Sequence, residues 1–305
     1  MKIEEQYCSP SAKDNGPTCL SKESLKTLID TYNKSKNNRK HHIVYYDNYK
    51  QIDLFKKLDN KMKKLTKGSG KYWLWPDIIS KMYPIDKYNL KFIKKNYFIP
   101  QMPKSWNKNT KEWLSNYDID NVMFQYSNAK KYSYKYIGTF SIDFALKDNF
   151  GNCLHSNFCN IDIKNSYIKN NIKYIGFITN LDKHDEPGSH WTSTFIILDH
   201  NSKSFGAYYY DSVSRKTPKM IYDFLLNIKK QCNIIYPNKI FKIKYNNKQH
   251  QFEDTECGMF SIIYQLRWLN LLLNNKNVSF SKVINNKNLN DKNVNNMRLE
   301  LFLHS

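Results

Sequence analysis

Cysteine is scarce in this chain, and no apolar stretch is long. Six cysteines in 305 residues are too few for a disulfide scaffold, so we expect reduced thiols in an intracellular protein. The longest apolar stretch, 261–273, is interrupted by Gln265 and Arg267 and falls short of the roughly 20 residues that a membrane-spanning helix needs. The first residues also lack the apolar segment of a signal peptide. These absences predict a soluble protein without a membrane span, in a reducing compartment.

Arginine and acidic residues are also few. Of 48 basic residues only four are arginines, and 27 acidic residues leave a formal net charge of +21. A charge of this size attracts polyanions. The lysine-rich stretches 61–71 and 91–95 alternate with aromatic residues at 72–75 and 97–98, a pattern compatible with nucleic-acid contact. A solvated lysine surface is the simpler interpretation, and non-specific DNA contact is the alternative.

The chain is long enough to bury a sizeable core, and it divides into two parts. Ser21 is a suitable N-cap for an amphipathic helix that extends to Tyr32, and shorter helical segments follow to about residue 96. Two prolines, Pro100 and Pro103, begin a polar linker. We therefore predict an N-terminal helical arm at 1–103 and a second domain at 104–305.

The second domain mixes helical and strand patterns. β-rich runs predict strands at 136–144, 172–179, 192–198, 204–210 and 240–245. Helices are predicted from Asn116 or Asp118, near 218–231, from about Cys257 and near 289–303. This mixture predicts an α+β core.

The most informative feature is an ordered set of four polar residues. His190 stands where a turn-rich stretch gives way to a strand, and Asp211 ends another strand. Gln251 precedes Cys257, which opens an apolar helix. These residues supply a base, an orienting carboxylate, an oxyanion donor and a thiol nucleophile, as acyl transfer by a thiol requires. Each residue alone is weak evidence, but the ordered set predicts a cysteine peptidase.

The surroundings of Cys257 suit a reactive thiol. Asp254 and Thr255 are plausible N-caps of the helix, and its positive end would favour the thiolate. Gly258 has no Cβ, so a substrate backbone could approach the sulfur. Asp254 and Glu256 oppose ionisation, because nearby carboxylates disfavour a thiolate. We therefore expect an imidazolium partner to provide most of the activation.

The other cysteines receive simpler interpretations. We interpret Cys8, Cys19 and Cys232 as structural or incidental. The segment 153–159 contains two cysteines and a histidine, but its spacing is not that of common zinc sites. We therefore predict no metal site.

The order His-Trp, Asp-Ser, Gln-x5-Cys-Gly resembles the clan of cysteine peptidases that contains the SUMO-deconjugating proteases and the adenovirus maturation protease. It looks most similar to the polyprotein-processing proteases of large nucleocytoplasmic DNA viruses, such as that of African swine fever virus. One departure is Asp211, where the swine-fever enzyme carries Asn and other clan members carry Asp. The resemblance rests on 188–191, 210–212 and 250–258, with weaker likeness at 8–21, 113–120 and 297–302.

The resemblance implies a papain-like or adenovirus-protease-like α+β core, with a central mixed β-sheet and a buried nucleophile helix. It implies that His190 is the general base and acid, Asp211 its orienter, Cys257 the nucleophile and Gln251 the oxyanion donor. A cleft walled by Trp191 would admit only small residues, so Trp191 and Gly258 are the expected substrate-binding residues.

The implied substrates are viral capsid or core polyproteins, cut after Gly-Gly or Ala-Gly pairs during virion maturation. The implied locations are the viral factory in the host cytoplasm and the virion. Two alternatives stay open: an isopeptidase that removes ubiquitin-like or SUMO-like modifiers, and a non-catalytic basic DNA-binding virion protein. We expect no cofactor, although DNA is an open alternative as an activator.

Overall fold

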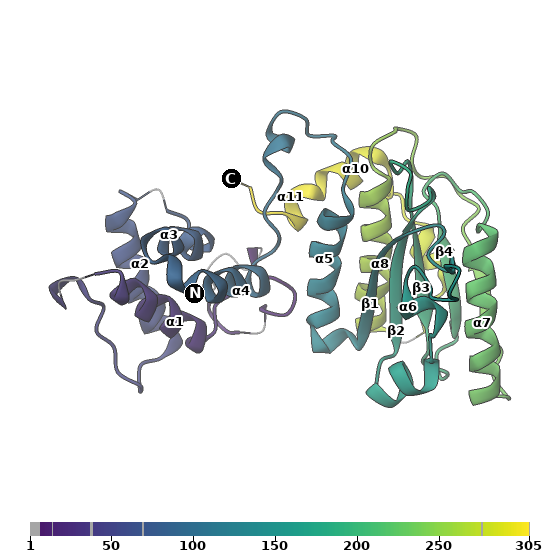
Figure 1. Ribbon diagram of the computed structural model, residues 1–305, viewed down its shortest axis with the longest axis horizontal. Coiled ribbons are helices and arrows are strands. Elements are labelled where there is room, and N and C mark those ends of the chain that lie inside the picture. The colour runs from purple at the N-terminus through teal and green to yellow at the C-terminus, as the bar shows by residue number, and fades with distance from the viewer. Residues whose placement is uncertain (1–6, 14, 37–38, 69, 276, 305) are drawn as a thin grey trace. The chain divides into compact units, whose positions relative to one another are not determined.

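The computed structural model describes residues 7–13, 15–36, 39–68, 70–275 and 277–304, with the backbone alone at 157 and 159. The chain divides into two compact units, 1–101 and 102–305 (Figure 1). The boundary that we place at 103/104 lies two residues further along the chain. Among the described helices, none is both long and apolar enough to cross a bilayer.

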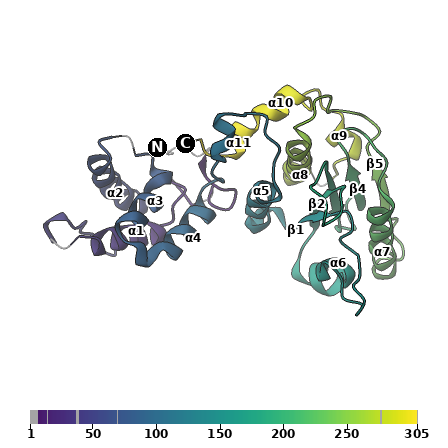
Figure 2. The same cartoon turned by 45° about the horizontal axis from the view of Figure 1, so that its top comes forward.

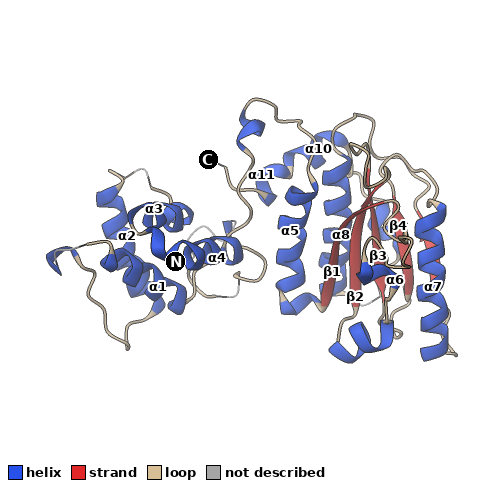
Figure 3. Cartoon of the chain, viewed as in Figure 1, coloured by secondary structure: helices blue, strands red, loops and turns tan. Residues whose placement is uncertain are grey.

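The N-terminal unit is built from helices, shown in blue in Figure 3. As predicted, Ser21 caps the first helix, and its hydroxyl accepts a hydrogen bond from Ser24 N at 3.1 Å. The helices of this unit are α1 (Lys22–Lys34), α2 (Gln51–Leu65), α3 (Trp75–Met82) and α4 (Lys87–Tyr97), with short 3-10 turns η2 (Arg39–His41), η3 (Tyr72–Leu74) and η4 (Pro84–Asp86).

The aromatic residues beside the lysine-rich stretches form the core of this unit. Trp75 and Phe98 are fully buried, and Tyr72 packs edge-on against both rings. Trp73 is only 3% exposed. Lys63 and Lys91 remain at the surface. Burial leaves these four rings little surface for base stacking, whereas Tyr97, the fifth aromatic residue of the pattern, is only partly buried.

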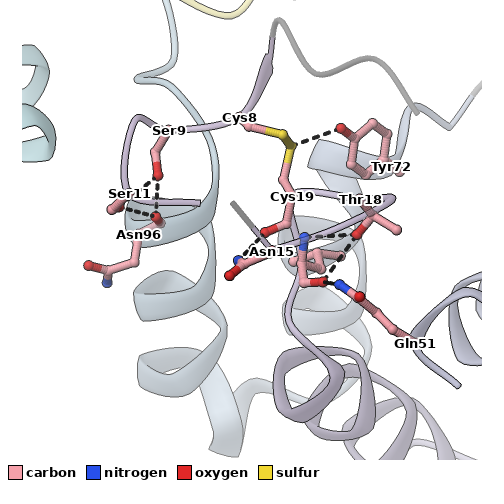
Figure 4. Close-up of a disulfide and its surroundings, with 10 residues drawn as sticks. Cys8, Ser9, Ser11, Asn15, Thr18, Cys19, Gln51, Tyr72 and Asn96 are labelled. Carbon is pink, nitrogen blue, oxygen red and sulfur yellow. Dashed lines mark hydrogen bonds between the residues drawn. A yellow bond between two sulfur atoms is a disulfide. The ribbon is translucent and has the colours of Figure 1, made fainter. Parts of the chain in front are cut away.

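A disulfide joins Cys8 and Cys19, whose Cα atoms lie 5.0 Å apart (Figure 4). Turns after Ser9 fold the segment back, and the Asn15 side chain donates to the Cys19 carbonyl at 2.8 Å. Cys153 is also disulfide-bonded. The expectation of reduced thiols is therefore wrong for these cysteines, because local turns bring Cys8 and Cys19, 11 residues apart, together; the disulfide gives both a structural role. Free thiols remain at Cys232 and Cys257.

The C-terminal unit contains a mixed five-stranded sheet in the order β1-β2-β3-β4-β5. The outer pairs β1/β2 and β4/β5 are parallel, and the pairs around β3 are antiparallel. All five predicted strands are confirmed, with ends that shift by at most three residues. Their bounds are Tyr134–Ser141 (β1), Tyr174–Asn180 (β2), Trp191–Ile197 (β3), Gly206–Tyr210 (β4) and Lys242–Tyr245 (β5).

Helices cover both faces of this sheet, as Figures 1 and 2 show. Side chains alternate along β3: Phe195 and Ile197 enter one apolar core, whereas Ile196 enters the other. The first core packs against α5 (Asn116–Asn128), α8 (Cys257–Asn274), α9 (Phe280–Ile284), α10 (Asp291–Asn296) and α11 (Arg298–Leu301). The second packs against α7 (Lys219–Ile235), α6 (Ser156–Cys159) and the π-helical turn η7 (Ile163–Tyr167). Further 3-10 turns are η5 (Lys104–Asn107), η6 (Lys130–Tyr132) and η8 (Ile168–Asn170).

The predicted α+β fold is confirmed, with one error at the C-terminus. The single helix predicted over 289–303 is two short helices, α10 and α11, separated at Met297. Asn290 caps α10 through its side chain. Asparagine competes for backbone hydrogen bonds and disfavours helix interiors, so this Asn-rich segment makes only short helices.

Candidate active site

His190 and Asp211 are brought together by the antiparallel pairing of β3 and β4. His190 directly precedes β3 and Asp211 directly follows β4, so both lie at the same end of the sheet. The His190 Nε2 atom lies 2.8 Å from Asp211 Oδ1, a buried hydrogen bond. The His190 carbonyl also accepts from Leu181 N at 2.9 Å, which fixes the backbone beside the ring.

Asp211 is completely buried and held from several sides. Asn246 accepts from the Asp211 N–H at 2.9 Å and donates to its carbonyl at 2.7 Å. The Val213 N–H donates to Asp211 Oδ1 at 2.9 Å. This frame leaves the carboxylate little freedom and aims it at His190. Nothing in the sequence pattern indicated Asn246, which lies 35 positions beyond Asp211.

Cys257 is the first residue of α8 and is only 2% exposed. Burial lowers the pKa of the His190 imidazole, but hydrogen bonds to Asp211 and Cys257 raise it more, to about 9. Because Nε2 bonds Asp211, the Nδ1 atom is the ring nitrogen left for the sulfur. The structure therefore brings Cys257, His190 and Asp211 into one hydrogen-bonded chain, and the raised pKa favours the protonated imidazolium form of His190.

The start of α8 differs from the sequence prediction. The N-cap is Glu256, and no side chain caps the helix. The predicted caps at Asp254 and Thr255 are wrong, because the helix begins directly at Cys257. The Thr255 hydroxyl instead donates to Glu256 Oε1 at 2.8 Å. Glu256 is buried directly beside Cys257, and a carboxylate at such a position disfavours a thiolate.

Arg298, at the start of α11, supplies a buried cation near this carboxylate. Its guanidinium carbon lies 4.5 Å from the centre of the Trp106 ring, and the residue is 3% exposed. Burial lowers the pKa of Arg298, whereas the charges of Glu256 and Cys257 are among the interactions that raise it. Arg298 falls within the weak C-terminal likeness at 297–302, and no sequence pattern predicts a role for it.

Gln251 is anchored to the residue that follows Asp211. Its Oε1 atom accepts from the Ser212 hydroxyl at 2.6 Å, and its backbone N–H donates to the Ser212 carbonyl at 3.0 Å. Its Nε2 atom donates to the Glu253 carbonyl at 2.6 Å, in the loop that leads to Cys257. An amide NH₂ has two hydrogens, so this bond accounts for one of them.

Trp191 and Gly258 pack against each other and against the segment before α5. The Trp191 indole donates to the Leu114 carbonyl at 3.0 Å. A Cβ added to Gly258 would lie 3.0 Å from Leu114 Cβ and 3.3 Å from Trp191 Cδ1. Protein side chains therefore fill the space beside the Gly258 Cα, so this glycine is required for packing, a role that the sequence pattern does not predict.

A pocket of about 570 Å³ lies beside Trp191, at the ends of β1 and β2. A second histidine–carboxylate pair stands there: His184 Nδ1 lies 2.7 Å from the buried Asp143 Oδ2. The residues that line this pocket include Trp113, His155, Asn180, Ser189 and Trp191. In the described part of the chain, no group of three or more His, Cys, Asp or Glu has an arrangement that could hold a metal ion.

The fold has a counterpart among solved structures. A crystal structure of an African swine fever virus protease aligns with a TM-score of 0.60 and covers 100% of this chain and 98% of its own, at 18% identity. The chain therefore has the fold of this viral protease. No protein-family model matches the chain.

Sequence comparison identifies viral relatives. The "Putative thiol protease" of Acanthamoeba polyphaga mimivirus is 32% identical over 158 residues, which are 52% of this chain and 48% of the relative. A cysteine protease of African swine fever virus is 24% identical over 207 residues, which are 64% of this chain and 69% of the relative. A protein of another isolate, named SUMO-1 cysteine protease, is 23% identical over 207 residues, with the same coverage.

These comparisons confirm the resemblance to viral cysteine proteases that the motifs predict. The enzyme class expected from the sequence is the class in the name of each sequence relative. The chain spans about half the length of the mimivirus relative and about two thirds of the swine-fever relatives.

Proposed function

We propose that the chain is a cysteine endopeptidase in which Cys257 is the nucleophile. The observation that supports this most is the position of the His190 ring, which bonds Asp211 through Nε2 and interacts with Cys257. A side chain held in this way can accept and return a proton at the thiol. The relatedness to viral cysteine proteases supports the same reaction class.

The proposed reaction has two acyl-transfer steps. The Cys257 thiolate attacks the scissile carbonyl, and its proton resides on His190. As the tetrahedral intermediate collapses, the imidazolium gives its proton to the leaving amine, and an acyl-enzyme thioester remains. Water then loses a proton to His190 and attacks the thioester, which releases the acid and the free thiol. Asp211 keeps the ring oriented and stabilises its positive charge.

Two donors are available for the oxyanion. The backbone N–H of Cys257 belongs to the first turn of α8 and has no partner within the helix. The second amide hydrogen of Gln251 can provide the other hydrogen bond, since the first donates to Glu253. Removing one oxyanion donor typically lowers turnover by about 10²–10³.

The proposed substrates are viral capsid or core polyproteins with Gly-Gly or Ala-Gly before the scissile bond. The lining of the pocket supports a preference for small residues. Trp113 and Trp191 both line the pocket next to His190, and bulky rings narrow such a cleft. The relatives are proteases of large DNA viruses, for which precursor processing in the viral factory or the virion is a consistent role.

A second candidate is deconjugation of SUMO-like modifiers, since one relative is named a SUMO-1 cysteine protease. The catalytic groups would be the same, because such modifiers also end in Gly-Gly. The third class, a non-catalytic DNA-binding protein, is less well supported, since Trp73, Trp75 and Phe98 are buried. DNA as an activator through surface lysines is retained as a proposal.

One experiment separates these classes. The full chain is offered a Gly-Gly-Xaa peptide, a viral core precursor and a ubiquitin-like conjugate, with and without duplex DNA. Cys257→Ala is the matched control, because it removes only the sulfur. We expect cleavage of peptide and precursor that Cys257→Ala abolishes. Faster cleavage of the conjugate would favour the isopeptidase, and undiminished cleavage by Cys257→Ala would refute the mechanism.

A further inference from the structure

A small hairpin, residues 146–154, follows β1 and presents apolar side chains to solvent. Leu154 N donates to the Leu146 carbonyl at 2.8 Å, and Asp148 N donates to the Asn152 carbonyl at 2.8 Å. An isolated β-bridge pairs Lys147 with Cys153. The segment is therefore a hydrogen-bonded hairpin with defined partners across it.

The tip of the hairpin is held by its own hydrogen bonds. Asp148 Oδ1 accepts from Phe150 N at 2.9 Å and from Asn152 N at 2.8 Å. Gly151 has a φ of 82°, a backbone conformation that residues with a Cβ rarely adopt. The disulfide at Cys153 restrains the returning strand. A turn of this kind presents Phe150 in a limited range of positions, which lowers the entropy cost of a contact there.

The apolar side chains of the hairpin are not part of a core. Phe150 is 90% exposed, Leu146 is 50% exposed and Leu154 is 38% exposed. A single exposed apolar residue needs no explanation. Three in one restrained hairpin of nine residues form a surface suited to binding an apolar partner.

The hairpin is continuous with the pocket beside Trp191. His155 follows Leu154 directly, lines that pocket, and packs edge-on against Phe140 with ring centres 4.8 Å apart. Trp113, which is 44% exposed, lines the same pocket. The base of the hairpin therefore leads directly into the wall of this pocket at His155.

We propose that hairpin 146–154 is an exosite that binds an apolar segment of the polyprotein substrate, outside the residues at the scissile bond. This inference rests on the proposed peptidase function. An apolar partner fits better than a nucleic acid, because Lys147 is the only cation of the hairpin and Asp148 places a carboxylate beside it. The hairpin thus adds recognition of the substrate protein to the selection of small residues near the thiol.

The test compares two substrates with the same cleavage sequence: a viral core precursor and a short peptide that carries only its cleavage site. Phe150→Asp replaces the exposed ring with a charge and leaves the fold intact, since Phe150 makes no core contact. Ile240→Asp is the matched control. Ile240 is 81% exposed and precedes β5, the strand at the opposite edge of the sheet from β1.

We expect Phe150→Asp to lower kcat/KM for the precursor by about tenfold, the size of effect of one well-placed interface residue. Cleavage of the peptide stays at the parent rate, and Ile240→Asp changes neither substrate. An equal effect on both substrates, or none on the precursor, overturns the exosite while the peptidase function stands. Loss of self-association in sedimentation with equal rates on both substrates would instead identify an interface between copies. If the parent protein cleaves neither substrate, the proposed function fails and the exosite fails with it.

Discussion

The Ser212 hydroxyl donates a buried 2.6 Å hydrogen bond to Gln251 Oε1. This bond connects the two halves of the proposed machinery. Ser212 follows Asp211, which orients His190, and Gln251 is the proposed oxyanion donor. The Ser212 carbonyl also accepts from Gln251 N at 3.0 Å. The dipeptide Asp211-Ser212 therefore positions both the His190 imidazole and the Gln251 side-chain amide.

Ser212→Ala should lower kcat by about tenfold, with KM little changed. The substitution leaves Gln251 in place but frees its side chain, so the loss is smaller than the about 10²–10³ typical when an oxyanion donor is removed. Ser204→Ala is the control, because that buried hydroxyl bonds Val278 O outside the site. Steady-state kinetics on the peptide checks this. Equal kcat values for the two variants would show that the hydroxyl does not position the amide.

Asp211→Asn should shift the alkaline limb of kcat/KM to lower pH. In the parent, burial lowers the pKa of His190, but Asp211 and Cys257 raise it to about 9. The imidazolium therefore keeps its proton as pH rises and loses it at about pH 9. Without the carboxylate, the ring loses its proton at lower pH.

The same shift has a consequence for stability. Because the folded pKa of about 9 exceeds the ordinary 6.5, this stabilisation is fully present below 6.5 and is lost as pH rises through about 9. Urea unfolding of the parent and of Asp211→Asn across this range checks the sign. An alkaline limb at the same pH in both proteins would contradict the assigned role of Asp211.

Gly258→Ala should destabilise the protein by roughly 1–3 kcal/mol, as overpacking of a filled site does. The added Cβ would lie 3.0 Å from Leu114 Cβ, so Leu114 or Trp191 must move. We also expect a lower kcat/KM, because Trp191 lines the pocket. Urea unfolding with tryptophan fluorescence measures both the stability and the indole environment. Ser261→Ala, elsewhere on α8, is the control, and a Gly258→Ala protein that matches it would remove the packing explanation.

Arg298→Met should lower kcat/KM, most strongly at acidic pH. The charge of Arg298 interacts with Glu256, Asp118, Glu112 and Cys257, so its loss makes the surroundings of the sulfur more negative and disfavours a thiolate. Adding Glu256→Gln to this variant should recover part of the loss, because the opposing charge is then absent. Arg298→Lys is the charge-conserving control. Iodoacetamide labelling of Cys257 as a function of pH checks this, and an unchanged profile in Arg298→Met would show that the guanidinium serves only packing on Trp106.

Much of the site followed from the sequence, because its main groups stand at element ends that local patterns reveal. His190 opens a β-rich run and Cys257 opens an apolar helix, so periodicity located both. The residues that hold or surround these groups could not be predicted from the sequence. Asn246 and Arg298 act across long sequence separations, and an isolated Asn or Arg has no local pattern that marks it. The burial of the aromatic residues near 72–75 could not be predicted, because exposed stacking and core packing use the same residue types.

The cysteine prediction failed for a related reason. Composition alone could not show that turns after Ser9 bring Cys8 next to Cys19. The number of cysteines excludes a disulfide-rich scaffold but not one or two local bridges. Composition also could not predict the break at Met297 between α10 and α11, because an asparagine-rich sequence fits both loops and short capped helices.

The proposed mechanism requires that the Cys257 sulfur forms a covalent bond with the substrate carbonyl while His190 carries the proton. Rapid acid quenching of the full chain with a Gly-Gly peptide ester, followed by peptide mass spectrometry, tests this directly. The predicted result is an acyl group on Cys257 that is absent from Cys257→Ala and strongly reduced in His190→Ala. An acyl group on Cys232, the second free thiol among the described cysteines, or turnover without any acylated cysteine, would contradict it.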